Sequence, residues 1–122
     1  MAIKWIFKRH DDILYVTAEG YDESFSGVTS YIDAIVKEEE LKFCRKILCD
    51  ERHLEYRLSI WNTFKLVKYN RKVMKRPVDI AIVTQKNNYD TGKFWETVSR
   101  NRGMRAGIFF DMKKAKTWLN SY

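Results

Sequence analysis

Hydrophobic and polar residues alternate one by one at the start of this chain. Ile3, Trp5 and Phe7 are separated by single residues, and a second β-rich segment, 13–19, follows the polar turn at 10–12. Such alternation is typical of a half-exposed strand, and a short connection favours an antiparallel pair. The pattern therefore predicts that the fold opens with a β-hairpin.

After Gly20 the hydrophobic spacing changes to that of helices, and it then switches between the two periods. Between 24 and 40 apolar residues recur every three or four positions, whereas 78–84 is an almost continuous apolar run. These patterns indicate an amphipathic helix and a strand buried on both faces. By the same criteria we predict further strands at 43–50 and 106–110, and further helices at 59–75, 90–103 and 111–119. The side chains that can cap these helices are Asp22 or Ser24, Ser59, Asp90 or Thr91, and Asp111.

The predicted order of elements is β-β-α-β-α-β-α-β-α. Repeated β-α units require right-handed crossovers and a mostly parallel sheet with helices over its faces, and the opening hairpin makes that sheet mixed. We therefore predict an α/β fold in a single domain spanning 1–122, with a mixed, mostly parallel sheet of about five strands flanked by four helices. Periodicity does not give the order of the strands.

Composition supports a folded core and a cytoplasmic location. Hydrophobic residues make up 45% of the 122 residues and aromatic residues 15%, which argues against disorder. The first nine residues lack the apolar region of a signal peptide, and no segment approaches the roughly 20 apolar residues of a transmembrane helix. Cys44 and Cys49 form no disulfide framework, so we expect both to be reduced thiols.

Polar residues gather where two of the predicted strands end. Because the carboxyl ends of parallel strands share one edge of a sheet, these residues are expected to lie together at the usual site of α/β folds. The start of the helix at 59–75 is predicted at the same edge. The candidate binding residues are Asp50, Glu51, Arg52, His53, Ser59, Asn87, Asn88 and Tyr89. A solvated loop whose charges pair with one another would have the same composition.

The residue types argue against catalysis and against a metal site. The chain has two His and two Cys, and none of the spacings H-E-x-x-H, C-x-x-C, G-x-S-x-G or G-x-G-x-x-G occurs. Thr91-Gly92-Lys93 resembles the end of a phosphate-binding loop, but the upstream glycine is missing because that position is Asn87. We therefore predict no cofactor, no metal and no enzymatic activity.

A row of lysines is predicted on one face of the helix at 59–75. Lys65, Lys68, Lys72 and Lys75 follow helical spacing in a chain of net charge +7. Such a face could attract an anionic partner, either nucleic acid or a membrane. A solvated helix surface explains the lysines equally simply, and no nucleic-acid-binding motif accompanies them, so we favour the solvated surface.

The four tryptophans offer a choice between core packing and ligand stacking. Trp5, Trp61, Trp95 and Trp118 include three on or beside the apolar faces of predicted helices. Core packing is therefore the better explanation. A cavity between the helices and the sheet stays open as an alternative.

Several segments together resemble a known family. They are Leu14–Gly20, Ile47–Arg52, Asp79–Val83, Gly107–Asp111 and Ala115–Leu119. Over essentially its whole length the chain resembles the SpoIIAA-like branch of the STAS superfamily. The resemblance implies a small mixed-sheet domain with a non-enzymatic role in regulation or ligand binding.

The resemblance also draws attention to Glu51. Classical anti-sigma-factor antagonists carry a phosphorylatable Ser or Thr directly after the Asp that closes the third strand. In this chain the Asp is Asp50 and the next residue is Glu51, so the phosphate switch is not expected. The layout is also similar to that of lipid-binding SEC14-type domains, which implies an apolar ligand as an alternative.

Our leading hypothesis is thus a bacterial protein-interaction or regulatory module whose partner is another protein or a second copy of the chain. The first alternative is a carrier of an apolar small molecule or lipid. The second is binding of nucleic acid through the lysine face, which we favour less. An enzyme is the least favoured class, because no set of nucleophile, base and orienting group is visible.

Overall fold

The framework of the protein is a five-stranded sheet, seen in a computed structural model that describes residues 3–121. In these residues the strands lie in sequence order, β1-β2-β3-β4-β5. The first pair is antiparallel and the other three pairs are parallel. The strands are β1 (Lys4–His10), β2 (Ile13–Asp22), β3 (Lys46–Tyr56), β4 (Asp79–Val83) and β5 (Arg105–Phe109). The predicted hairpin and the mixed, mostly parallel sheet are confirmed.

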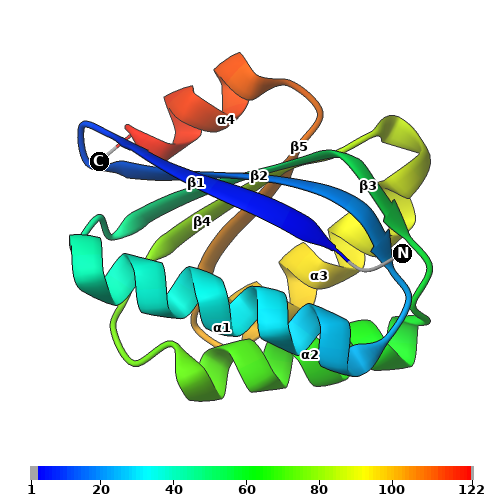
Figure 1. The fold of residues 1–122 in the computed structure, drawn as a ribbon. Coiled ribbons are helices and arrows are strands. Elements are labelled where there is room, and N and C mark those ends of the chain that lie inside the picture. Colours follow the sequence, from blue (N-terminus) through cyan, green and yellow to red (C-terminus); the bar gives the residue numbers. More distant parts are fainter. Residues whose placement is uncertain (1–2, 122) are drawn as a thin grey trace.

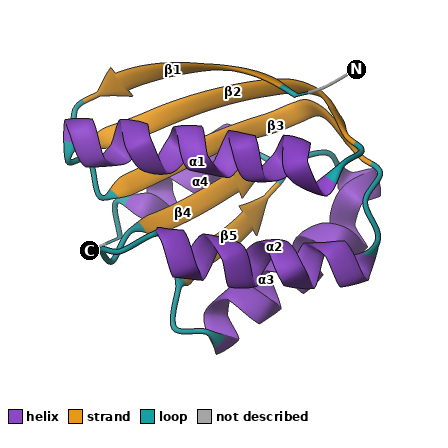
Figure 2. Ribbon diagram, turned by 60° about the horizontal axis from the view of Figure 1, so that its bottom comes forward, coloured by secondary structure: helices purple, strands orange, loops and turns teal. Residues whose placement is uncertain are grey.

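Four α-helices cover the two faces of the sheet unequally (Figures 1 and 2). Three of them lie on one face and α4 lies on the other, where it packs on β3, β4 and β5. The helices are α1 (Phe25–Lys42), α2 (Ile60–Val73), α3 (Tyr89–Asn101) and α4 (Met112–Leu119), and a 3₁₀ turn, η1 (Lys86–Asn88), leads into α3. The predicted α/β class with four flanking helices is confirmed for the described residues.

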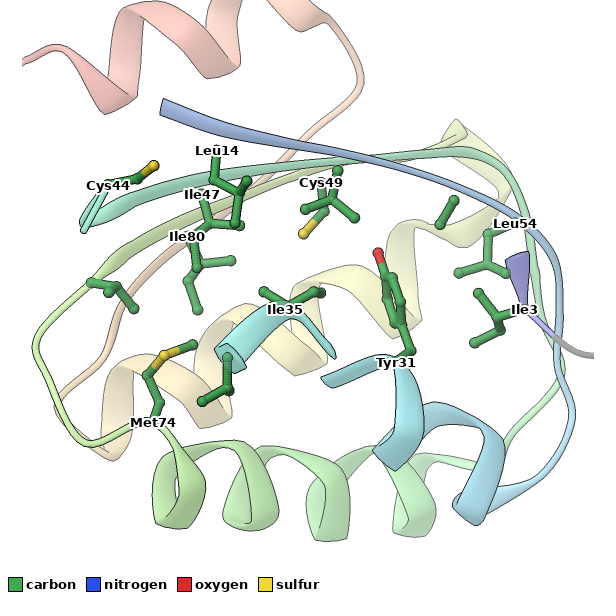
Figure 3. Packing of buried hydrophobic residues seen from close by; sticks show 14 residues of the cluster. Ile3, Leu14, Tyr31, Ile35, Cys44, Ile47, Cys49, Leu54, Met74 and Ile80 are labelled. Atoms are coloured by element: carbon green, nitrogen blue, oxygen red, sulfur yellow. The ribbon is translucent and has the colours of Figure 1, made fainter. Parts of the chain in front are cut away.

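The alternation of side chains in β3 divides the core between the two layers. Ile47 and Cys49 belong to a cluster with Tyr31 and Ile35 of α1, whereas Leu48 belongs to a second cluster on the α4 side. Figure 3 shows Tyr31 rising from α1 with its hydroxyl directed toward Cys49. A strand covered on both faces must be apolar on both, which explains the adjacent apolar residues in this part of β3.

Side-chain caps begin three of the four helices as predicted. Ser24 Oγ accepts from Gly27 N at 3.0 Å, Ser59 Oγ from Asn62 N at 3.3 Å, and Asp111 Oδ1 from Lys113 N at 2.7 Å. The prediction that Asp90 or Thr91 caps α3 is wrong. The 3₁₀ turn runs directly into this helix, and Asn88 at the cap position donates from Nδ2 to Thr84 Oγ1 instead.

The predicted end of the third strand is also wrong. β3 was expected to stop at Asp50, but it continues to Tyr56. The reason is that β2 is long enough to pair with the polar segment, with Glu19 opposite His53 and Asp22 opposite Tyr56. Polar side chains on one face of this extension obscured its strand character in the sequence.

A β-bulge interrupts β3 inside this extension. Thr17 pairs with Asp50 and Glu19 pairs with His53, so Ala18 lies opposite two residues, Glu51 and Arg52. One extra residue in a strand reverses which face the following side chains occupy. The bulge therefore sets the direction of every side chain in the last part of β3.

Candidate functional site

The bulge places Glu51 and Tyr56 on the same face of the sheet. In a regular strand, two residues five positions apart would point to opposite faces. Here both residues line a cavity beneath the helices, together with Cys49 before the bulge and Leu54 after it. Glu51 is consequently only 5% exposed. The expectation that Glu51 belongs to a polar loop at the strand end is wrong, because the strand continues and turns this side chain inward.

Two tyrosine hydroxyls hold the Glu51 carboxyl group. Tyr31 Oη of α1 donates to Oε2 at 2.9 Å, and Tyr56 Oη of β3 donates to Oε1 at 2.5 Å. Burial raises the pKa of Glu51 to about 7, although the two hydroxyl donors act in the opposite direction by favouring the carboxylate. Glu51 therefore changes its protonation state near neutral pH.

The cavity lies between the sheet and α1, α2 and α3, and its volume is about 120 Å³. It is smaller than the enclosed, dry apolar cavity of about 150 Å³ that binds benzene, but it is partly open, so a bound molecule could extend beyond it. Most of its wall is apolar, and its apolar lining residues include Ile32, Ile35, Leu66, Met74, Ile80 and Trp95. A mostly apolar cavity with a few polar groups has the composition of a small-molecule site.

Asp22 is the second acid in the cavity wall. Its Oδ1 accepts from the backbone N–H groups of Arg57 and Leu58, which follow β3. Burial raises the pKa of Asp22 to about 6, and those two backbone donors partly oppose the shift. The end of β2 is thus joined to the start of the connection that leads to α2.

Asp50 and Arg52 form a pair of their own outside the cavity. Arg52 Nε and Nη2 donate to the two carboxylate oxygens of Asp50, each at 2.8 Å, which is a bidentate ion pair. The guanidinium lowers the pKa of the Asp50 carboxyl group. Because each residue satisfies the other, the predicted cluster of four ionisable residues divides into this pair, the buried Glu51 and His53.

An open groove brings together His53, Asn87 and Asn88, as the edge prediction required. Its volume is about 590 Å³, and Glu19, Glu55 and Gln85 complete much of its polar wall. The side chain of Gln85 donates to the backbone oxygen of Arg52, which ties the loop after β4 to the bulge. This groove lies at the carboxyl edge of the sheet, whereas the Glu51 cavity lies under the helices.

Ser59 and Tyr89 lie outside both pockets. Ser59 caps α2, as described above. Tyr89 is the first residue of α3, and its ring packs on Phe110 with a centroid separation of 6.0 Å. Their place in a binding site therefore stays a prediction.

The four lysines of the predicted helix at 59–75 are exposed, as their spacing indicated, although α2 ends at Val73 and Lys75 lies just beyond it. Lys65, Lys68, Lys72 and Lys75 all project from the solvent side of α2 and its carboxyl end. The Nζ of Lys68 lies 5.7 Å from the ring centroid of Phe64. This exposure does not distinguish a solvated face from a face that binds an anionic partner.

Large apolar side chains are exposed at the starts of α1 and α2. Trp61 is 77% exposed, Ile60 52% and Phe25 39%, and Figure 2 shows the two helices side by side. Core packing was predicted for the tryptophans, and for Trp61 that prediction is wrong. The apolar spacing gives the inner face of a helix, but it does not show how much of the helix a neighbouring element covers. We call Phe25, Ile60 and Trp61 the edge patch.

Residues 3–121 contain neither a candidate metal site nor a helix that could span a membrane. Within that range, no three or more His, Cys, Asp or Glu side chains are grouped so that they could hold a metal ion. None of the helices described there has the length and apolar character needed to cross a bilayer.

Comparisons with known proteins place the fold. No family model matches the sequence, and no curated protein matches it. The crystal structure of an anti-sigma factor antagonist from Mycobacterium paratuberculosis matches with a TM-score of 0.62 and 14% identity, covering 97% of this chain and 94% of that one. The fold is SpoIIAA-like. An uncharacterized protein of the DUF3478 family with this SpoIIAA-like fold, from Shewanella loihica, matches with a TM-score of 0.56, 19% identity and the same coverage.

The most informative polar residues of this SpoIIAA-like chain were not among the predicted site residues. Tyr31, Tyr56, Asp22 and Asn70 all line the cavity with Glu51. One signal was present for Tyr31, which sits in the apolar stripe of α1 and therefore has a hydroxyl that needs a buried partner. The other three have no such signal, because their inward direction depends on the bulge and on how α2 packs.

Proposed function

We propose that this chain is a non-enzymatic regulatory module that binds a protein partner through the edge patch. The observation that carries the proposal is the exposure of Phe25, Ile60 and Trp61 at neighbouring helix starts. Contiguous exposed apolar side chains mark interaction surfaces, and aromatic residues are enriched at the centres of protein interfaces. The helices that carry the patch follow β2 and β3, so the patch lies at the carboxyl edge of the sheet (Figure 1).

The fold supports a protein as the partner. One protein of the same fold is an anti-sigma factor antagonist, a role exercised on other proteins. A switch by phosphorylation after Asp50 is not part of the proposal, because Glu51 stands at that position and is buried. Partner binding would then be regulated by concentration, or by a ligand.

The state of the cysteines supports a non-enzymatic role. Burial raises the pKa of the Cys49 thiol well above its usual range, and burial also raises that of Cys44. A thiol that stays protonated is a poor nucleophile. His10, at the hairpin turn, is paired with Asp11 at 3.3 Å and lies far along β1 from the carboxyl edge.

Site-specific photocrosslinking tests the proposal. A benzophenone amino acid placed at position 61 should give a discrete adduct with one partner in the native cells. The same amino acid at Phe43, which is 68% exposed beyond the other end of α1, is the matched control. Trp61→Ala should abolish capture of that partner without changing the free energy of unfolding by more than about 0.5 kcal/mol, because the side chain is exposed.

Two outcomes would contradict the edge patch as the docking surface. One is a partner crosslinked from position 43 and not from position 61. The other is a partner whose affinity, measured with purified proteins, is unchanged by Trp61→Ala and Ile60→Ala together. Either result would move the interface elsewhere on the fold.

A further inference from the structure

The charges in the wall of the Glu51 cavity have one sign. Glu51 and Asp22 are both in the wall, and among its lining residues within 3–121 there is no Lys, Arg or His. This is notable in a protein whose net charge is +7. An anionic head group, such as the carboxylate of a fatty acid or a phosphate, would meet two acids there and no cationic side chain among the described lining residues. The wall therefore disfavours the anionic lipids that the sequence left open.

The same wall has spare capacity to accept hydrogen bonds. Each oxygen of Glu51 accepts one tyrosine hydroxyl, whereas an ionised carboxylate can accept about four bonds in total. Asn70 is 9% exposed and lines the cavity, and its Oδ1 is buried with no hydrogen-bond partner in the described part of the chain. A buried acceptor without a donor costs roughly 1–3 kcal/mol, so a ligand that donates hydrogen bonds would recover part of this cost.

We propose that this partly open cavity binds a small cationic ligand, in which a primary ammonium group is attached to an apolar body no larger than a benzene ring. The ammonium group would lie against Glu51, while Asp22, bonded to the start of the connection to α2, and the oxygen of Asn70, further along that helix, add acceptors elsewhere in the wall. The apolar body would lie against Ile35, Leu66 and Trp95. This site is separate from the edge patch, and it stands or fails independently of the proposed protein partner.

The ionisation of Glu51 fits such a ligand. Burial holds its pKa at about 7, so near neutral pH a large fraction of the protein keeps this carboxyl protonated. A bound ammonium would favour the carboxylate, because an opposite charge at close range in a buried site stabilises the ionised form. Binding at pH 6.5 would then release a proton from the protein.

Matched small molecules test the inference on the unmodified protein. Benzylamine, toluene and benzoate share one ring and differ in charge, and their binding can be followed through the NMR signals of the isoleucine methyl groups in the cavity. We expect benzylamine to bind about tenfold more tightly than toluene, and benzoate to give no shift. Calorimetry at pH 6.5 in two buffers of different ionisation enthalpy should detect proton release with benzylamine only.

Two variants locate the charge that is recognised. Glu51→Gln should reduce benzylamine affinity to that of toluene while leaving toluene affinity unchanged. Asp50→Asn removes an acid one residue away that is outside the cavity and acts on Glu51 only weakly, so it should change each affinity by less than about twofold. Equal or tighter binding of toluene by the unmodified protein would overturn the cationic ligand, and so would benzoate binding. If neither benzylamine nor toluene shifts the cavity methyl signals, the cavity is not a ligand site at all.

Discussion

Glu51 joins the two layers of this domain through a single side chain. Tyr31 reaches it from α1 and Tyr56 reaches it from the far side of the bulge, so one carboxyl group fixes a helix and a strand end together. Burying an ionised acid costs free energy unless hydrogen bonds or an opposite charge compensate. The two hydroxyls offset only part of this cost, and the part that is not offset is the reason why the pKa of Glu51 is raised.

The sign of this shift predicts how stability depends on pH. Between the unfolded pKa of 4.5 and the folded value of about 7, the unfolded state has lost the Glu51 proton and the folded state has kept it. The contribution of Glu51 to the free energy of unfolding is therefore greatest below pH 4.5. It falls as the pH rises to about 7 and is constant at higher pH. Glutamine does not ionise, so the variant lacks this pH dependence. We therefore expect the difference in the free energy of unfolding between Glu51→Gln and the unmodified protein to increase by about 2–3 kcal/mol from pH 5 to pH 8, measured by urea denaturation.

Asp50→Asn is the contrasting variant for this measurement. Its neighbour Arg52 lowers the pKa of Asp50, so the stability that this group contributes is lost only as pH falls below about 4. The difference between Asp50→Asn and the unmodified protein should change much less than that of Glu51→Gln from pH 5 to 8, because the charge of Asp50 is the smallest of the causes that act on the pKa of Glu51. Tyr31, Tyr56, Cys49 and Asp22 stay in place in both variants, so Asp50→Asn takes away only this smallest contribution to the raised pKa of Glu51. An equally small change for Glu51→Gln would show that Glu51 titrates normally.

Sequence reasoning reached the right neighbourhood at this scale but not the right orientation. It selected Asp50 to His53 as the important stretch, and it noticed that Glu51 replaces a hydroxyl residue. It could not find the direction of Glu51, because that direction follows from one extra residue in the pairing of β3 with β2. Pairing register depends on contacts between distant segments, which periodicity within a single segment does not contain.

At the scale of elements, the sequence predicted the kind and order of every strand and helix in the described residues. Alternation identified β1, a β-rich composition identified β2, and the apolar run identified β4. The errors fell at ends, where β3 continued to Tyr56 and where η1 replaced a side-chain cap on α3. Strand ends are set by the length of the neighbouring strand, and helix starts by loop geometry. Strand ends and helix starts therefore depend on a neighbouring element, which the pattern within one segment does not contain.

The contact between α3 and β5 gives a prediction at this scale. A Cβ atom built on Gly92 would lie 2.7 Å from Ile108 Cγ1, so the helix approaches the strand as closely as a glycine permits. Overpacking costs about 1–3 kcal/mol, and the higher helix propensity of alanine returns up to about 1 kcal/mol. We therefore expect Gly92→Ala to lower the free energy of unfolding by about 1 kcal/mol in chemical denaturation.

Thr97→Ala is the control, since Thr97 is an exposed residue of the same helix. This substitution should leave stability unchanged or raise it slightly through helix propensity. If Gly92→Ala were as stable as Thr97→Ala, α3 would have room to move away from β5. The close approach would then be no constraint on the cavity that Gly92 also lines.

At the scale of the whole molecule, charge is separated by location. The surface carries a basic excess that includes the lysines of α2, while the cavity wall holds acids alone. A basic exterior favours anions of any kind through long-range attraction. The interior selects by contact and favours the opposite charge. The surface would therefore attract anions, whereas the cavity would bind cations.

Replacing Lys65, Lys68, Lys72 and Lys75 by glutamine tests the surface part of this picture. The variant loses four of the charges that make up the net +7, so it should elute from a heparin column at clearly lower salt. Because all four residues are exposed, its free energy of unfolding should change by less than about 1 kcal/mol. Its affinity for benzylamine should not change.

A nucleic acid that bound tightly at physiological salt, and lost this affinity in the four-glutamine variant, would contradict the solvated-face interpretation. It would also restore nucleic acid as a partner. The steepness of the salt dependence would then count the phosphates contacted.

The bulge in β3 also limits how this protein can evolve. Substitutions can be accepted one at a time along the strand, each judged by its local fit. Loss of one residue between Asp50 and Leu54 would instead turn Leu54 and Tyr56 toward solvent and bring their polar neighbours under the helices. A lineage could tolerate such a deletion only with simultaneous replacements along the strand. Relatives that keep this cavity should therefore vary in residue identity here but not in length.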